Sequence, residues 1–122
     1  PMESGLLTGK VTREWIDNLP ENDWRRHKQE DHPVASLLRP PKLEPFLQLV
    51  DQLRAIAGPS GHTVSQLAVA WPLRRPEVTS AIVGARRKGQ IAETVRAAKW
   101  SLGQAEQNAT AAAVDAFRKA ID

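Results

Sequence analysis

Three cations stand close behind a β-branched run in the last third of the chain. The run covers residues 78–83 and ends at Gly84, and the cations are Arg86, Arg87 and Lys88. A glycine turn lets a ligand approach the backbone, and a helix that starts soon after it points free N–H groups at an anion. Arginine adds charge-assisted donors in a bidentate fork. This order of residues predicts a phosphate site; the alternative is a solvated loop in a basic protein.

Four helices are predicted to hold this segment in place. Apolar residues at intervals of three and four predict the first helix over residues 42–57, and Gly58 ends it. The second helix opens at a capping box made by Thr63 and Gln66, and Pro72 should kink or shorten its end. The remaining two helices are predicted over residues 89–98 and 104–121.

Residues 78–84 are predicted to form one clear buried strand, because the run shows no polar alternation. A single strand cannot satisfy its own backbone groups and needs neighbours on both sides. The chain therefore looks incomplete. The predicted fold class is α/β, with mostly helical structure around one strand, as in part of a TIM-type (β/α)8 barrel.

Residues 11–41 are polar and show neither a helical nor a strand period. We expect an irregular loop there, with one short helix near its N-terminal end, since connections of this length tend to be functional or mobile. Among the tryptophans, Trp71 is expected in the core and Trp100 beneath the last helix.

None of the three histidines is placed by a motif that carries chemistry. His27, His32 and His62 are each expected to be solvated at the surface. His27 and His32 stand near Glu30 and Asp31, but their spacing matches no established metal-ligand pattern. No metal site is predicted.

The composition of the 122 residues limits the classes of function. Net charge is +3 and 41% of residues are hydrophobic, which suits one packed domain with an anionic ligand rather than a dedicated nucleic-acid binder. A weaker alternative, nucleic-acid binding, would use residues 24–28, where a tryptophan adjoins cations. Cysteine is absent and no apolar run is long enough to span a membrane, so we expect a cytoplasmic protein with no membrane partner.

Three segments resemble one family in their order and spacing. They are residues 4–10 (SGLLTGK), 64–71 (VSQLAVAW) and 82–94 (IVGARRKGQIAET). Together they resemble the C-terminal part of an aldo-keto reductase, an NADP-dependent (β/α)8-barrel oxidoreductase. The resemblance implies that residues 1–122 are a C-terminal segment of such a domain, with residues 11–41 as an irregular loop within it.

The resemblance also implies which residues contact the cofactor. In the family, the loop after the seventh strand folds over the cofactor pyrophosphate. Its counterparts here are Met2, Ser4, Gly5 and Leu6, with Lys10 as a further charge. The end of the eighth strand corresponds to Gly84 and Ala85.

The adenosine end of the cofactor would lie on the next segment. The resemblance implies that Arg86 meets the 2′-phosphate that distinguishes NADPH from NADH, and that Gln90 flanks the adenosine. Glu93 and Thr94 would face the adenine ring, although the family often has asparagine where Thr94 stands.

The chain departs from the family in its catalytic half. The family reduces carbonyls with an aspartate, a tyrosine acid, a lysine and usually a histidine on earlier strands, and this chain has no tyrosine. We therefore expect no catalytic residue here, NADP(H) as the cofactor, and a carbonyl substrate only in the complete barrel. Self-association through the uncovered strand is also expected. The alternative is a non-catalytic remnant that binds a nucleotide or a partner.

Overall fold

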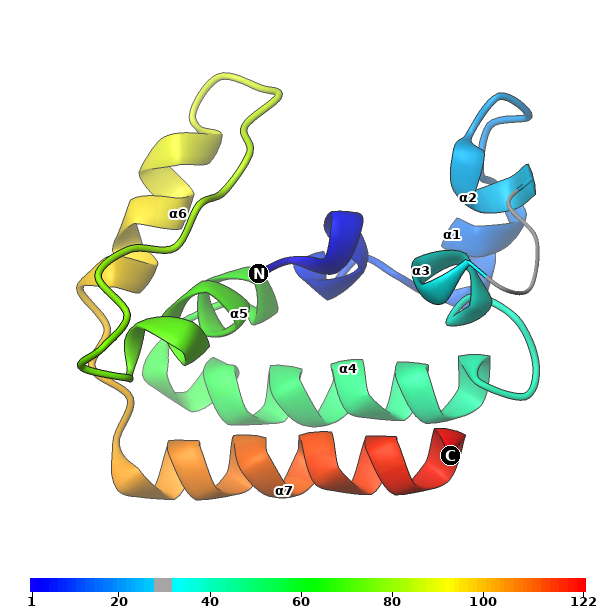
Figure 1. The fold of residues 1–122 in the computed structure, drawn as a ribbon. Helices are drawn as coiled ribbons and strands as arrows, with labels where there is room; N and C mark the ends of the chain where they lie inside the picture. The colour runs from blue at the N-terminus through cyan, green and yellow to red at the C-terminus, as the bar shows by residue number, and fades with distance from the viewer. Residues whose placement is uncertain (28–31) are drawn as a thin grey trace.

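The computed structural model describes residues 1–27 and 32–122, and the regular elements among them are helices (Figure 1). Two 3-10 helices are present, η1 (Glu3–Thr8) and η2 (Gly58–Ser60). The α-helices are α1 (Arg13–Asp17), α2 (Trp24–His27), α3 (Pro33–Ser36), α4 (Leu43–Ala57), α5 (Val64–Leu73), α6 (Gln90–Ala98) and α7 (Gln104–Ile121).

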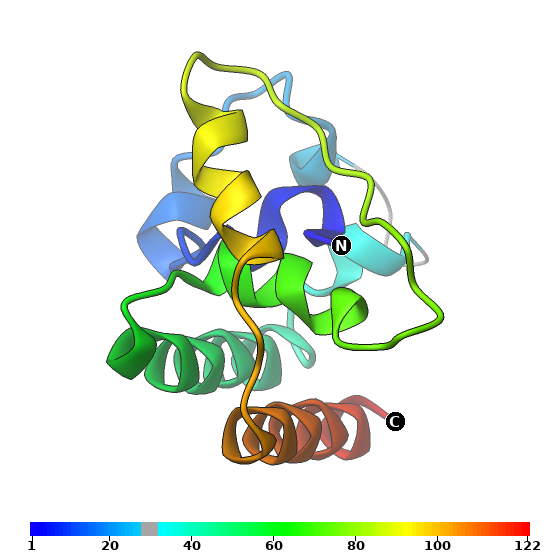
Figure 2. The same cartoon turned by 90° about the vertical axis from the view of Figure 1, so that its left-hand side faces the viewer.

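The two long helices, α4 and α7, lie side by side at the base of the molecule and run in opposite directions (Figures 1 and 2). Their contact includes an edge-to-face pair, Phe46 and Phe117, whose ring centroids are 6.2 Å apart. Phe46 is 1% exposed, and burial of such a side chain stabilises the fold by about 1.5–3 kcal/mol. The helix predicted over residues 42–57 is therefore confirmed, and its apolar stripe is what packs.

The apolar residues form two clusters. One joins α4 and α5 with Ala97 of α6 and Ala113 of α7. The other lies between α4 and the N-terminal region; its members are Leu6, Val11, Leu19, Leu38, Phe46 and Val50. The second cluster anchors the N-terminal residues to the helical base, so the turn at residues 2–8 rests on packed side chains.

The predicted helix starts and stops are confirmed. The Thr63 hydroxyl accepts from the Gln66 N–H at 3.2 Å, and the Gln66 side chain accepts from the Thr63 N–H at 3.1 Å. Pro72 lies in the last turn of α5, which ends one residue later. The Gly103 N–H donates to Glu106 Oε2 at 2.8 Å, which caps the start of α7.

The predicted buried strand at residues 78–84 is wrong. No strand occurs in residues 1–27 or 32–122, and residues 78–84 form an open trace between α5 and α6 (Figure 2). Ala81 and Val83 contact the first apolar cluster, whereas Ile82 is 89% exposed. A strand needs a neighbouring backbone for its N–H and C=O groups, and none pairs with this segment in the described residues.

The expectation of a wholly irregular loop at residues 11–41 is also corrected. The segment contains three short helices, α1, α2 and α3. The Thr12 hydroxyl caps α1 by accepting from the Trp15 N–H at 3.0 Å. The His32 ring caps α3 by accepting from the Ala35 N–H at 3.3 Å, so His32 is half-buried and not solvated as predicted.

Other single-residue predictions divide. Trp71 is half-buried under the Arg74 guanidinium, and not fully in the core as predicted. His62 is corrected too, since its ring stacks on Trp100 with centroids 3.9 Å apart. His27 is exposed as expected, but the Glu30 and Asp31 once considered beside it lie outside the described residues, as does Lys28.

Across residues 1–27 and 32–122, none of the helices combines the length and the apolar character that crossing a bilayer demands.

Candidate functional site

Three segments that are distant in the sequence enclose a cleft of about 700 Å³, here called the main cleft. They are the N-terminal turn (residues 2–8), residues 20–25, and the segment from residue 82 to Gln90 at the start of α6. The volume is within the range of small-molecule and cofactor sites, about 300–1,000 Å³. The cleft therefore brings the N-terminal turn and the predicted phosphate-binding segment to one place.

The N-terminal turn has an unusual backbone. Glu3, Ser4 and Gly5 have φ angles of 47°, 53° and 91°, all in the left-handed region that non-glycine residues rarely adopt. The Met2 carbonyl closes the turn by accepting from the N–H groups of Gly5 at 3.0 Å and Leu7 at 3.1 Å. Such strain persists only where the surroundings hold it, and it concentrates at ligand sites.

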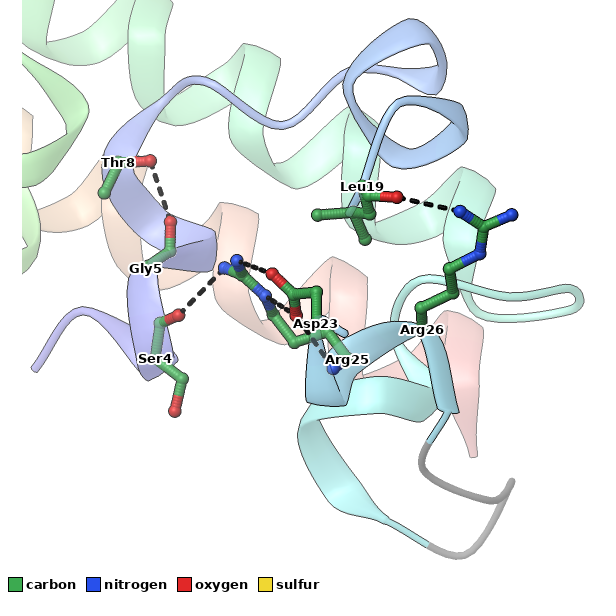
Figure 3. Close-up of polar contacts among 7 residues, drawn as sticks. All are labelled: Ser4, Gly5, Thr8, Leu19, Asp23, Arg25 and Arg26. Carbon is green, nitrogen blue, oxygen red and sulfur yellow. Dashed lines mark hydrogen bonds and ion pairs between the residues drawn. The ribbon is translucent and has the colours of Figure 1, made fainter. Parts of the chain in front are cut away.

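An ion pair stands at the wall of the main cleft beside this turn (Figure 3). Arg25 Nη2 lies 2.5 Å from Asp23 Oδ2, and Arg25 Nε donates to Asp23 Oδ1 at 2.9 Å. Arg25 Nη1 reaches across to the Ser4 carbonyl at 3.4 Å. The hydrogen bond from Arg25 lowers the pKa of Asp23 from 3.8 to about 2, so this carboxylate stays ionised.

The opposite wall of the main cleft is the arginine loop, residues 84–89. The Gln90 side chain folds back and accepts from the Arg86 N–H at 2.8 Å, which fixes the end of the loop. Gly89 has a φ of 84° and precedes α6, whose first turn receives no side-chain cap. The free N–H groups of that turn and the exposed Arg86 give this wall a positive potential.

A second hollow of about 430 Å³, the side pocket, adjoins the main cleft and shares Met2, Thr8 and Gln90 with it. Arg87 Nη2 donates to Glu93 Oε2 at 2.9 Å at its rim. This hydrogen bond from Arg87 lowers the pKa of Glu93, which therefore stays ionised. The side pocket thus has a charged rim beside α6.

Most of the predicted site residues line these two hollows. The main cleft includes Met2, Ser4, Gly5, Gly84, Arg86 and Gln90. The side pocket includes Met2, Lys10, Gln90, Glu93 and Thr94. Two predicted residues differ: the Leu6 side chain is fully buried in the second apolar cluster, and Ala85 is exposed but lines neither hollow. Binding by all eleven residues stays a prediction.

Sequence reasoning missed part of the main cleft. Asp23 and Arg25 belong to its wall, but residues 24–28 had been considered only as a nucleic-acid alternative. The available signal was the Asp-x-Arg spacing, which allows a bidentate pair across one turn. Thr8 was also missed; its hydroxyl donates to the Gly5 carbonyl at 2.7 Å and steadies the N-terminal turn.

Comparisons with known proteins give one family. The sequence model of the Aldo/keto reductase family matches residues 1–116. A Schizosaccharomyces pombe protein, provisionally named as a voltage-gated potassium channel subunit beta, is 38% identical over 100 residues, which are 82% of this chain and 27% of that protein. The L-glyceraldehyde 3-phosphate reductase of Escherichia coli O157:H7 is 36% identical over 97 residues, 80% of this chain and 26% of the enzyme.

A third relative is the aldo-keto reductase YhdN of Bacillus subtilis (strain 168), 33% identical over 104 residues, 84% of this chain and 29% of that protein. The chain thus spans a little over a quarter of the length of these relatives. No solved structure matches it significantly.

Proposed function

This chain belongs to the aldo/keto reductase family, and we propose that it forms the NADP(H)-binding C-terminal part of a TIM-barrel enzyme that reduces an aldehyde or ketone. One observation carries the proposal. Residues of the N-terminal turn and of the arginine loop, some eighty positions apart in the sequence, line the same cleft. In a (β/α)8 barrel, ligands bind at the C-terminal ends of the strands, where such loops meet.

The main cleft suits a dinucleotide by size and by chemistry. Its volume of about 700 Å³ accommodates a cofactor segment. A Cβ at Gly84 would meet nothing within 4 Å, so the backbone there is open to a ligand. Arg86 and the first turn of α6 supply donors for phosphate oxygens on one wall. These residues therefore fit a phosphate-bearing cofactor.

Each wall has a separate part in the proposed complex. Arg86 takes the adenosine 2′-phosphate, because an exposed guanidinium offers a planar fork to phosphate oxygens. The N-terminal turn, with Ser4 and Gly5, covers the pyrophosphate, and Lys10 adds a positive charge from the side pocket. When bound, the cofactor supplies the hydride that reduces the carbonyl carbon.

The proton for that reduction has no donor of the expected kind in this chain, which contains no tyrosine. The residues described above bind and orient, and we assign none of them to proton transfer. The 122 residues alone should therefore show no turnover when purified and supplied with NADPH and a panel of reactive aldehydes. Steady oxidation of NADPH would contradict this assignment.

Tryptophan fluorescence tests the cofactor proposal directly. Trp24 lines the main cleft and is 38% exposed, so a cofactor bound there should change its emission. Titration with NADPH should give a saturable signal, with weaker binding of NADH. Trp24→Phe serves as the control, since it should remove most of the signal without abolishing binding measured by calorimetry. Absence of saturable binding in calorimetry would refute the proposal.

A second candidate is the non-catalytic one, association with a partner chain. Ile82 is 89% exposed in an extended segment, and an extended edge of this kind readily pairs with another backbone. We propose self-association through residues 78–84 as its simplest form. Concentration-dependent sedimentation without any nucleotide binding would favour this candidate.

A further inference from the structure

We propose that Arg25 is a positioning residue of the main cleft: clamped by Asp23, it holds the left-handed N-terminal turn through the Ser4 carbonyl and so shapes the wall on which the cofactor lies. The cofactor part of this inference rests on the proposed function. The holding of the turn does not, because it is a property of the chain without any ligand.

The clamp itself is well built. Asp23 engages Arg25 through both carboxylate oxygens, at 2.5 Å to Nη2 and 2.9 Å to Nε, and Asp23 Oδ1 also accepts from the Arg25 N–H at 2.9 Å. The guanidinium carbon lies 4.9 Å from the centre of the Trp15 ring, which covers one face. The side chains of Arg25 and Asp23 are only 19% and 13% exposed. Most exposed ion pairs lack this geometry and contribute little.

The clamp points Arg25 at the part of the backbone that needs support. Ser4 is a non-glycine residue at φ 53°, directly before Gly5 at φ 91°. Arg25 Nη1 lies 3.4 Å from the Ser4 carbonyl, and a Cβ built on Gly5 would stand 3.6 Å from the same nitrogen. The guanidinium therefore lies directly against the turn. A left-handed pair of this kind costs free energy and relaxes if its surroundings release it.

The ion pair also suits its place opposite the arginine loop. Arg25 and Arg86 both line the main cleft. The charge of Arg86 reaches Asp23, where it is one of the influences that lower the pKa of that carboxyl. Because Asp23 is already bound by Arg25, its negative charge is neutralised locally, and Arg86 remains available to an incoming phosphate. Arg25 thus acts through the turn and through Asp23.

Arg26 provides a matched control within the same helix. Its Nη1 donates to the Leu19 carbonyl at 2.8 Å, and its side chain extends away from the N-terminal turn (Figure 3). Arg26 does not line the main cleft. Replacing either arginine by methionine removes one positive charge and keeps an unbranched stem, so the pair differ only in what the guanidinium held.

Amide hydrogen exchange on the intact chain tests the positioning role without a ligand. The N–H groups of Gly5 and Leu7 both donate to the Met2 carbonyl, so their exchange reports on the turn. In Arg25→Met we expect both amides to exchange about fivefold faster or more, as befits loss of a charge-assisted hydrogen bond. In Arg26→Met they should be unchanged. Equal exchange in the two variants would overturn the proposal.

Two further variants keep the test decisive if Arg25→Met folds poorly. Arg25→Lys retains the charge but loses the planar fork, and Asp23→Asn loosens the clamp. Both should speed exchange at Gly5 and Leu7 as Arg25→Met does, and full rescue by lysine would refute the role of the fork.

NADPH binding then connects the turn to the cofactor. Arg25→Met should weaken NADPH binding by about fivefold or more, with Arg26→Met within about twofold of the wild type. Unchanged NADPH affinity in Arg25→Met would refute the link to the cofactor. If the wild-type chain binds no NADPH, the proposed function fails, and the exchange data still decide whether Arg25 holds the turn.

Discussion

Arg86→Ala is the substitution that most sharply separates NADPH from NADH. Within residues 1–27 and 32–122 no salt bridge engages the Arg86 side chain, which is exposed at the wall of the main cleft. Its removal therefore breaks no ion pair of the described fold, and the free energy of unfolding should change by about 0.5 kcal/mol or less. Any larger effect on cofactor affinity belongs to the complex.

The size of that effect follows from the kind of contact. A hydrogen bond to a charged group contributes about 1.5–3 kcal/mol. The main cleft is open on one side, so solvent screens the charge and the lower part of this range applies, about 1.5–2 kcal/mol. At about 1.4 kcal/mol per tenfold change, NADPH affinity should fall about 10- to 30-fold. NADH lacks the 2′-phosphate, so its affinity should change by less than about threefold.

Isothermal titration of wild type and Arg86→Ala with both cofactors measures the difference. Arg118→Ala is the matched control, since it removes the same charge from the exposed end of α7, outside both hollows. It should leave both affinities within about twofold, as expected of a distant, screened charge. Equal losses for NADPH and NADH in Arg86→Ala would refute the assignment of Arg86 to the 2′-phosphate.

Three further predictions concern stability and association. Thr63→Ala removes the capping hydroxyl of α5 and should cost about 1 kcal/mol in urea unfolding; the exposed Thr79→Ala should cost nothing measurable, and equal effects would argue against the cap. Because Arg25 lowers the pKa of Asp23 from 3.8 to about 2, the stabilisation by this pair is complete above 3.8 and is lost as the pH falls toward 2. The difference in melting temperature between wild type and Asp23→Asn should shrink over that interval, and a constant difference would contradict it. Ile82→Lys should reduce self-association in sedimentation velocity without lowering the melting temperature, since Ile82 is 89% exposed; unchanged association would exclude this edge.

The helices were predictable because their signals are local. The apolar spacing of residues 42–57, the Thr63 and Gln66 capping box, and Glu106 at the start of α7 each act within one or two turns. Such patterns specify an element before any tertiary contact forms. The clustering of the N-terminal turn with the arginine loop was anticipated through the family resemblance, since no local pattern joins segments so distant in the sequence.

The errors come from features that depend on partners. Residues 78–84 have the apolar composition of a buried strand, but pairing needs a second backbone and the described residues provide none. The Asp23–Arg25 pair depends on a turn that brings both groups beside Ser4, which no spacing rule specifies. The stacking of His62 on Trp100 joins residues 38 positions apart, so it was equally hidden from a local reading.

Mapping NADP⁺ binding on the backbone tests the central claim most directly. In a titration of the isotope-labelled chain followed by amide NMR, we expect saturable shifts confined to residues 2–10 and 84–94, the segments that line the two hollows. Amides of α4 and of the C-terminal half of α7 should stay unperturbed, since they line neither hollow. Saturable shifts elsewhere, or none at all, would contradict the account of this chain as the cofactor-binding part of an aldo/keto reductase.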